Sequence, residues 1–365
     1  MFRFSGKIDQ HPLTDSTVNT NIIEKMKNIL VTGGLGYIGS HTVVALQNAG
    51  FNVYIIDDLS NSQLEVWEKI TGITGVQPTY YNIDLKDFNA VSVFFQSHPI
   101  DGIIHFAAYK AVGESVAKPL MYYRNNLMGL MNILEAMEEN KVDNFIFSSS
   151  CTVYGQADVM PINEATPLKR PESPYGNTKK MGEEIIEDFV SATDKKAIAL
   201  RYFNPVGAHD SAAIGEVPNG IPNNLIPYVT QTAMGIRESL GVFGNDYETR
   251  DGTAVRDYID VNDLADAHVK AIQRLLDSKN KSNLEFFNLG SGTGSTVLEI
   301  VDAFEKANNL KINYEIKPRR AGDIVQAYAD YSCAKSELGW EPKTPLQTSM
   351  QTAWKFQQQL GEVAE

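Results

Sequence analysis

The sequence predicts an α/β fold in which a doubly wound parallel sheet carries a smaller, sequence-discontinuous C-terminal lobe. Short apolar runs alternate with segments of helical period, and the first apolar run is followed at once by a cluster of glycines. Continuous apolar strands are typical of parallel sheets that helices cover on both faces. At 365 residues and 43% hydrophobic content, the chain can form two domains, or one large core with an added lobe.

Regular structure is expected from Met26, and residues 1–25, which are polar and aperiodic, are interpreted as a flexible extension. A strand at 29–31, a helix at 37–47 and a strand at 53–56 open the pattern. Further strands are predicted at 79–82, 102–106, 144–149, 197–203 and 286–289, and further helices at 90–96, 120–138 and 175–191.

The glycine cluster "TGGLGYIG" lies between the first strand and the first helix. Gly34, Gly36 and Gly39 satisfy G-x-G-x-x-G, and Gly33 gives the related G-x-x-G-x-x-G. Glycine lets the backbone approach a pyrophosphate, which the free N–H groups of the helix start then bind. Asp57 ends the second strand, where a carboxylate accepts ribose hydroxyls and repels a 2′-phosphate. The pattern therefore favours NAD over NADP and over a purely structural turn, whereas the glycines of 288–296 are interpreted as a plain loop.

The stretch "ESPYGNTKKMGEE" holds a candidate catalytic pair. Ser173 is a good N-cap and Pro174 suits the first turn, so Tyr175 and Lys179 share one helix face. Free tyrosine titrates near pH 10, and an ammonium about 4 Å away is worth on the order of 4 kcal/mol at an effective dielectric of 20. Lys179 is thus expected to lower the pKa of Tyr175, which becomes the proton acceptor.

Ser150 ends the strand before this helix, at the edge where parallel strands line the ligand crevice. Its hydroxyl is expected to be a hydrogen-bond partner, because it is far less acidic than a phenol. The same Tyr-x-x-x-Lys spacing recurs at Tyr331 and Lys335, near the end of the chain and away from any nucleotide-binding strand. That second pair is predicted to be a coincidence.

After residue 203 the sequence becomes rich in Pro, Gly and Asn, which indicates a new lobe. We expect a dinucleotide-binding domain at 26–204 with returning segments at about 255–291. The substrate lobe is expected at 205–254 and 292–365.

Bulk properties exclude several classes of partner. A net charge of −13 argues against nucleic acid and anionic membranes, and no apolar run approaches the roughly 18 residues that span a bilayer. The six histidines form no metal-binding pattern, so no metal is expected. Only two cysteines occur, Cys151 and Cys333, which fits the reducing cytoplasm.

Motifs spread along nearly the whole chain from Met26 resemble the UDP-glucose 4-epimerases, a family of extended short-chain dehydrogenase/reductases. They are "VTGGLGYIGSHT", "HFAAYKAVGESVAKPL", "FIFSSSCTVYG", "SPYGNTKKMGEE", "LRYFNPVGAH", "GIPNNLIPYV", "FGNDYETRDGTAVRDYI" and "KPRRAGD". The resemblance implies NAD-dependent interconversion of UDP-glucose and UDP-galactose through a 4-keto intermediate. It also implies a homodimer that pairs through helices 120–138 and 175–191.

The resemblance implies a catalytic triad of Ser150, Tyr175 and Lys179, and two sets of ligand contacts. The implied NAD contacts are Gly33, Gly36, Tyr37, Ile38, Gly39, Asp57, Asn61, Asp84, Phe106, Ala107, Lys110, Asn125, Ser148, Tyr175, Lys179, Tyr202 and Phe203. The implied UDP-hexose contacts are Ser150, Tyr175, Asn204, Asn224, Leu225, Phe243, Arg256, Arg320, Asp323 and Ala327. For each of these residues, the alternative is a surface or packing role.

Alternative functions remain open at this point. A UDP-glucuronate 4-epimerase shares the pattern, because the sequence does not fix the C6 substituent. A nucleotide-sugar 4,6-dehydratase needs Asp-Glu directly after the serine, where this chain has Cys151 and Thr152. A non-catalytic NAD-binding scaffold predicts a broken triad, which is not found. Cys151 is interpreted as a small core residue rather than a nucleophile, and the small Ala327 suggests that N-acetylated UDP-sugars are also accepted.

Overall fold

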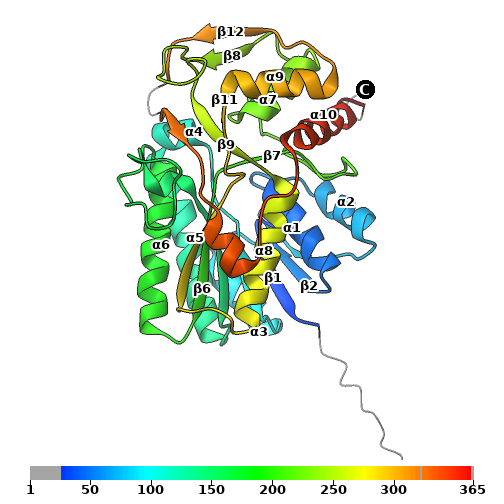
Figure 1. Ribbon diagram of the computed structural model, residues 1–365. Coiled ribbons are helices and arrows are strands. Elements are labelled where there is room, and N and C mark those ends of the chain that lie inside the picture. Colours follow the sequence, from blue (N-terminus) through cyan, green and yellow to red (C-terminus); the bar gives the residue numbers. More distant parts are fainter. Residues whose placement is uncertain (1–25, 321–322, 363–365) are drawn as a thin grey trace, which may run out of the picture.

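The computed structural model describes residues 26–320 and 323–362, and the extension predicted at 1–25 lies outside them. Within the described chain, seven strands form a parallel sheet in the order β10-β6-β5-β4-β1-β2-β3, which confirms the predicted fold class (Figure 1). These strands are β1 (Asn28–Thr32), β2 (Asn52–Ile56), β3 (Thr79–Tyr81), β4 (Gly102–His105), β5 (Asn144–Ser150), β6 (Lys196–Tyr202) and β10 (Leu284–Leu289).

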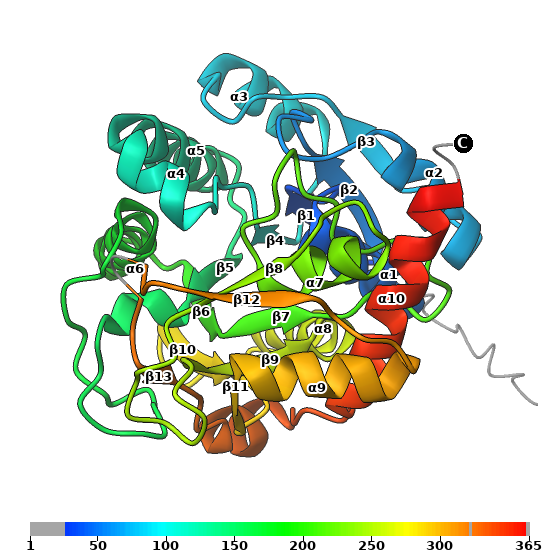
Figure 2. The same ribbon diagram turned by 90° about the horizontal axis from the view of Figure 1, so that it is seen from above.

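Helices cover both faces of this sheet (Figure 2). One face carries α1 (Tyr37–Asn48), α2 (Glu65–Thr74) and α8 (Val261–Leu276), and the other carries α3 (Phe88–Ser97), α5 (Pro119–Glu139) and α6 (Pro174–Ala192). Neighbouring side chains of β1 divide between the two cores: Ile29 and Val31 enter one, and Leu30 enters the other. This double burial is why the strands read as continuous apolar runs.

A second lobe stands above the carboxyl ends of the large sheet in Figure 1. Its central strand, β9 (Val255–Asp260), pairs with β7 (Asn204–Val206), β11 (Gly294–Thr296) and β13 (Gln326–Ala327), and β8 (Leu240–Phe243) pairs with β12 (Tyr314–Lys317). The helices here are α7 (Leu225–Ala233), α9 (Val297–Asn308) and α10 (Leu346–Glu362). Short helical segments elsewhere are α4 (Val112–Ala117), η1 (Cys151–Tyr154) and η2 (Ala334–Leu338).

The chain crosses between the two parts more than once. β9 pairs within the second sheet, whereas α8, which follows it, packs against strands of the large sheet. The segment around η2 crosses back again, because the buried Trp340 indole donates to the Asp263 carbonyl of α8 at 2.8 Å. We therefore propose a dinucleotide-binding domain of 26–204, 261–291 and 334–340, with the remaining described residues in the substrate lobe.

Two further properties concern the described ranges only. None of their helices has the length and apolar character that crossing a bilayer requires. In the same ranges, no three His, Cys, Asp or Glu side chains are grouped to hold a metal ion. Cys151 and Cys333 are both free thiols.

Candidate active site

The glycine loop is closed by contacts that only glycine permits. Gly33 has a φ of +70° and its N–H donates to the Ile56 carbonyl at 2.8 Å. A Cβ on Gly39 would lie 2.1 Å from the Gly33 carbonyl oxygen, far inside contact distance. Gly36 is the N-cap of α1 and supplies no capping side chain. The first N–H groups of α1 thus face an open approach, which fits a dinucleotide pyrophosphate.

Asp57 follows β2 and is tied to the same loop. Its carboxylate, 8% exposed, accepts from the Leu35 and Leu59 N–H groups at 3.0 Å each and from the Ser62 hydroxyl at 2.6 Å. Burial raises the pKa of this carboxyl, while the three donors act in the opposite direction. The acid therefore stands beside the glycine loop, as the ribose-binding acid of this motif does.

Three consecutive serines at the end of β5 make hydrogen bonds to four different neighbours. The Ser148 carbonyl accepts from the Lys179 ammonium at 2.6 Å, and the Ser148 hydroxyl bonds the Tyr202 hydroxyl. The Ser149 hydroxyl donates to a Glu183 carboxylate oxygen at 2.5 Å. Ser150 is buried, and its Oγ accepts from the Thr152 N–H at 3.3 Å. The end of β5 therefore carries Ser150 and also holds the Lys179 ammonium in place.

Tyr175 and Lys179 project from the first turns of α6, whose start follows the predicted pattern. Ser173 is the N-cap, and its Oγ accepts from the Gly176 N–H at 3.1 Å. Tyr175 is half-buried, and Lys179 is 4% exposed. Burial raises the pKa of Tyr175 to about 12, opposed by the Ser150 hydroxyl beside it.

Burial also lowers the pKa of Lys179 to about 7, opposed by the charge of Glu183. The expectation that Lys179 lowers the pKa of Tyr175 was therefore wrong for this structure. The Lys179 ammonium is directed at the Ser148 carbonyl, and loss of water dominates both groups.

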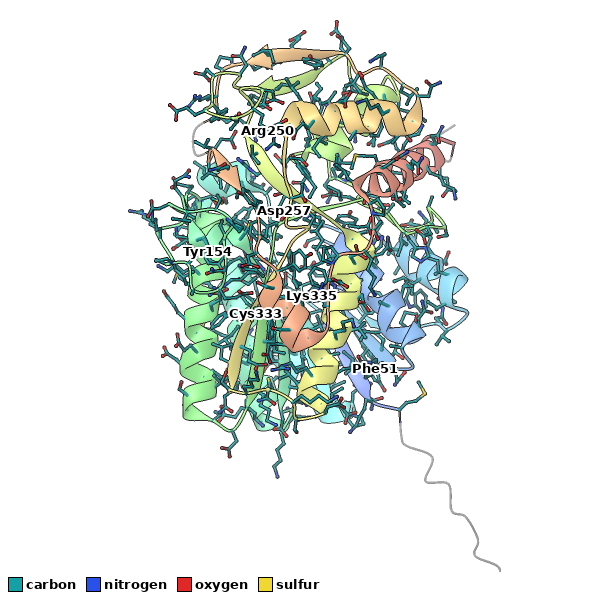
Figure 3. All side chains as sticks on the ribbon, in the orientation of Figure 1. Phe51, Tyr154, Arg250, Asp257, Cys333 and Lys335 are labelled. Atoms are coloured by element: carbon teal, nitrogen blue, oxygen red, sulfur yellow. The ribbon has the colours of Figure 1, made fainter. Side chains whose placement is uncertain are left out.

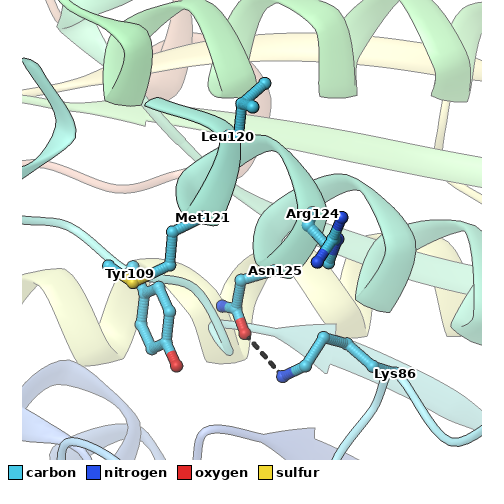
Figure 4. Close-up of a pocket in the computed structure, with 6 residues that line it drawn as sticks. All are labelled: Lys86, Tyr109, Leu120, Met121, Arg124 and Asn125. Carbon is cyan, nitrogen blue, oxygen red and sulfur yellow. Dashed lines mark hydrogen bonds between the residues drawn. The ribbon is translucent and has the colours of Figure 1, made fainter. Parts of the chain in front are cut away.

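Asp84 and Asn125, predicted cofactor contacts, are linked through Lys86. Its ammonium lies 2.8 Å from an Asp84 carboxylate oxygen and donates to the Asn125 Oδ1 at 2.9 Å (Figure 4). Asn125 and Lys86 border a cavity of about 330 Å³, whose lining is completed by Tyr109, Leu120, Met121 and Arg124. Ser150, Tyr175 and Lys179 do not line this cavity, so it is not the reaction centre.

The other predicted cofactor residues are spread over several elements, and only some of them touch the glycine loop. A Cβ on Gly33 would meet the Ala107 nitrogen at 2.8 Å, so the segment after β4 rests against the loop. The Phe106 ring packs 4.7 Å from the His268 ring, and Ile38 packs into the same core. Asn61 Oδ1 accepts from the Asn219 amide at 3.2 Å. The Phe203 N–H donates to the Leu289 carbonyl at 3.1 Å.

The predicted UDP-hexose contacts form a cluster in the second lobe. The Arg320 Nε lies 3.0 Å from Asp323 Oδ2, and its guanidinium carbon lies 4.7 Å from the Phe243 ring centroid. An Arg256 Nη2 lies 3.8 Å from the other Asp323 oxygen, and Arg256 pairs with Ala327 across β9 and β13. Two guanidinium groups, a carboxylate and an aromatic ring are therefore gathered, although they are distant in sequence.

The remaining predicted contacts come from the segment that joins the two parts. Asn204 lies on β7 opposite Tyr258 of β9. Asn224 is the N-cap of α7, and Leu225 is its first residue. Asn224 donates to Glu216, and so does Lys110.

Sequence reasoning missed a buried ion pair behind the triad. The Arg201 Nη2 and Nε lie 2.6 and 2.9 Å from the two Glu183 oxygens, and Arg201 Nη1 donates to the Tyr154 hydroxyl at 3.0 Å. Glu183 follows Lys179 by one helical turn, so the pair anchors α6 against β6. A charged residue inside the apolar run "AIALRYF" was the available signal, since a buried charge requires a partner.

Asp257 was also missed, and it organises the second glycine stretch. Its carboxylate, 0% exposed, accepts from the Ser291 N–H at 2.7 Å, the Ser291 hydroxyl at 2.6 Å, the Gly292 N–H at 3.1 Å and the Ala329 N–H at 3.0 Å (Figure 3). The stretch is thus a loop wrapped around one acid, continued by β11. Asp257 also fixes the strand that carries Ala327.

The second Tyr-x-x-x-Lys pair has an unrelated environment. The Tyr331 ring packs on Trp340 with centroids 6.3 Å apart, and Lys335 is an exposed residue of η2 that pairs with Glu341 (Figure 3). Neither residue contacts the serines of β5. This geometry agrees with the interpretation of that pair as a coincidence.

Comparisons with known proteins place this architecture in a family. The family model described as GDP-mannose 4,6 dehydratase matches residues 30–353. A Bacillus subtilis protein named UDP-glucose 4-epimerase is 52% identical over 330 residues, which is 90% of this chain and 96% of the relative. A UDP-glucose-4-epimerase structure from Stenotrophomonas maltophila, with bound NAD and formylated UDP-arabinopyranose, superposes with a TM-score of 0.89 at 45% identity, covering 92% of this chain and 99% of that one.

A more distant solved structure is the UDP-Glc/GlcNAc 4-epimerase of Campylobacter jejuni. It superposes with a TM-score of 0.78 at 34% identity, covering 91% of this chain and 99% of that one. The family model, the sequence relatives and the solved structures all extend over both parts of the fold. The chain therefore belongs to the family of the GDP-mannose 4,6 dehydratase model and, within it, to the UDP-glucose 4-epimerases.

Proposed function

We propose that this chain interconverts UDP-glucose and UDP-galactose by oxidising and re-reducing C4 of the hexose, with NAD as its resident cofactor. The observation that supports the proposal is the arrangement at the end of β5, where the Ser150 hydroxyl lies beside Tyr175 and the Ser148 carbonyl accepts from the Lys179 ammonium at 2.6 Å. The glycine loop at the carboxyl end of β1 lies along the same edge of the sheet. The glycine loop and Asp57 fit NAD, which the related Stenotrophomonas maltophila structure contains.

The residues of this chain handle the proton and the sugar. NAD, when bound, accepts the C4 hydride and returns it to the opposite face of the 4-keto sugar, so that no net oxidation occurs. Tyr175 takes the O4 proton as the hydride leaves and gives it back afterwards, and the Ser150 hydroxyl orients O4. Because burial holds the pKa of Tyr175 at about 12, the phenol needs nearby positive charge to act as a base. The cationic ring of oxidised NAD would supply that charge, and the Lys179 ammonium is held nearby at the Ser148 carbonyl.

The substrate lobe is proposed to bind the UDP part. Arg256 and Arg320 suit a diphosphate, the Phe243 ring suits uracil, and the Asp323 carboxylate suits the uridine ribose hydroxyls. Binding that concentrates on UDP leaves the hexose free to turn over between the two hydride transfers.

The test is a substrate panel with the purified protein and no added NAD. UDP-galactose, UDP-GlcNAc and UDP-glucuronate are each supplied, and the 4-epimer is measured by chromatography. We expect UDP-glucose from UDP-galactose, and release of nicotinamide absorbance on denaturation. Turnover of UDP-glucuronate alone, or bound NAD without any turnover, would instead support the uronate epimerase or the scaffold.

We also propose that N-acetylated UDP-sugars are substrates. Ala327 is 2% exposed and packs with Phe203, Val153 and the half-buried Cys151. Cys151 is the residue that follows Ser150 in the chain. The related Campylobacter jejuni structure is named for both UDP-Glc and GlcNAc. Ala327→Tyr adds a phenol beside the hexose, so conversion of UDP-GlcNAc should fall at least tenfold more than that of UDP-galactose. Equal losses on the two sugars, measured as kcat/KM, would contradict this assignment.

The dehydratase alternative lacks its acid and base. Cys151 and Thr152 follow Ser150, and burial raises the pKa of the Cys151 thiol to about 12, so it stays protonated at neutral pH. The family model takes its name from a dehydratase, but these two positions do not supply that chemistry.

For assembly, we propose a homodimer through α5 and α6, and for location the cytoplasm. Leu120, Met128 and Met131 expose apolar side chains on α5, which a second copy would cover. The two free thiols fit a reducing compartment. Sedimentation at the mass of a single chain would rule the dimer out.

A further inference from the structure

Glu216 connects the two halves of the site through a single oxygen. Its Oε1 accepts from the Lys110 ammonium at 2.7 Å and from the Asn224 amide at 2.6 Å. Lys110 lies after β4 of the large sheet, whereas Asn224 is the N-cap of α7 in the second lobe. The Glu216 side chain is only 12% exposed, so these two partners stabilise its negative charge more than water does.

Asn224 does not act as its position suggests. It is the N-cap of α7 with an extended backbone, where asparagine commonly caps the helix, yet its side chain makes no capping hydrogen bond. Its amide group is directed instead at Glu216. Glu216 therefore fixes the orientation of Asn224.

The segment that carries Glu216 is also held at its start. The Tyr37 hydroxyl, on the first turn of α1, donates to the Gly207 carbonyl at 2.7 Å. The Lys110 ammonium lies 5.8 Å from the centroid of the Tyr37 ring. The helix after the glycine loop, α1, is thus in contact with the segment that leads to α7. This contact is made by Tyr37, Lys110 and Glu216.

We propose that Glu216 is a positioning residue that couples the cofactor site to the UDP site. Lys110 neutralises and holds the carboxylate, and the carboxylate in turn orients Asn224. The proposal rests on the proposed function and on the contacts that the family resemblance implies, which are Lys110 with NAD and Asn224 with the UDP-hexose. If Lys110 is removed, an uncompensated negative charge remains beside a site for a diphosphate, and like charges repel. Loss of a group on the cofactor side should therefore weaken UDP binding.

The test is a double-mutant cycle on the protein as purified with NAD. Dissociation constants for UDP are measured by calorimetry for the parent, Lys110→Met, Glu216→Gln and the double variant. In the parent protein, Lys110→Met is expected to weaken UDP binding about tenfold. In the Glu216→Gln protein, the same substitution is expected to weaken UDP binding less than about twofold. Lys118→Met is the matched control, because Lys118 is exposed and forms an ion pair with Glu114 on its own surface, so it should change UDP affinity equally little in both backgrounds.

The possible results distinguish the coupling through Glu216 from the proposed function. Equal weakening by Lys110→Met in both backgrounds would overturn the coupling, since a simple contact or packing role is additive. If the Glu216→Gln protein fails to fold, Glu216→Ala gives a second background without the charge, and the same comparison applies. A parent protein that retains NAD but binds no UDP would refute the proposed function itself.

Discussion

Tyr175→Phe is expected to lower the rate of UDP-galactose conversion by about 100- to 10,000-fold, the range that general acid–base groups contribute. The substitution removes the hydroxyl that carries the O4 proton and leaves the ring that fills the space beside Ser150. Because the glycine loop and Asp57 are untouched, bound NAD should stay at the parental level. The measurements are kcat for UDP-galactose and nicotinamide released on denaturation.

Tyr331→Phe is the matched control for this prediction. Tyr331 has the same spacing to a lysine, but its ring packs on Trp340, away from β5. The control should keep parental activity. A Tyr175→Phe protein as active as the parent would remove the chemical basis of the proposed function.

Glu183→Leu is expected to lower the free energy of unfolding by about 3–5 kcal/mol, because it leaves the buried Arg201 guanidinium without its counter-charge. Both side chains of the pair are 4% exposed, and the other side chains that Arg201 contacts, Tyr154 and Phe286, are aromatic and carry no negative charge. The measurement is the urea midpoint and slope of unfolding.

The double variant Glu183→Leu with Arg201→Met is its control. Replacing both charges with apolar groups removes the desolvation cost as well as the attraction, so most of the stability should return. A double variant as unstable as Glu183→Leu alone would show that the loss comes from packing, and not from an unpaired charge.

The parts of the fold that follow local rules could be predicted from the sequence. Apolar runs located β1 and β2, and Ser173 with Pro174 marked the start of α6. The glycine loop was recognisable because its constraint is local: Gly39 must be glycine to clear the carbonyl of Gly33, six residues earlier. Resemblance to a family then supplied the ligand contacts, which no local rule provides.

The parts that depend on distant partners could not be predicted. Lys110 and Glu216 are 106 positions apart, and nothing in either neighbourhood specifies the other. Strand pairing depends on distant partners as well: β9 pairs with β7 and β13, which lie far from it in the sequence. The pKa of Tyr175 was misjudged because the charge of Lys179 was considered and burial was not.

The late position of β10 in the chain affects how the protein can be made. β6 ends at Tyr202, yet its neighbour β10 begins only at Leu284, and α8, which covers one face of the sheet, begins at Val261. A nascent chain on the ribosome thus carries an unpaired strand edge and an uncovered apolar face until nearly three hundred residues have emerged. We therefore expect that a chain whose translation stalls before β10 is more prone to aggregate than the finished protein.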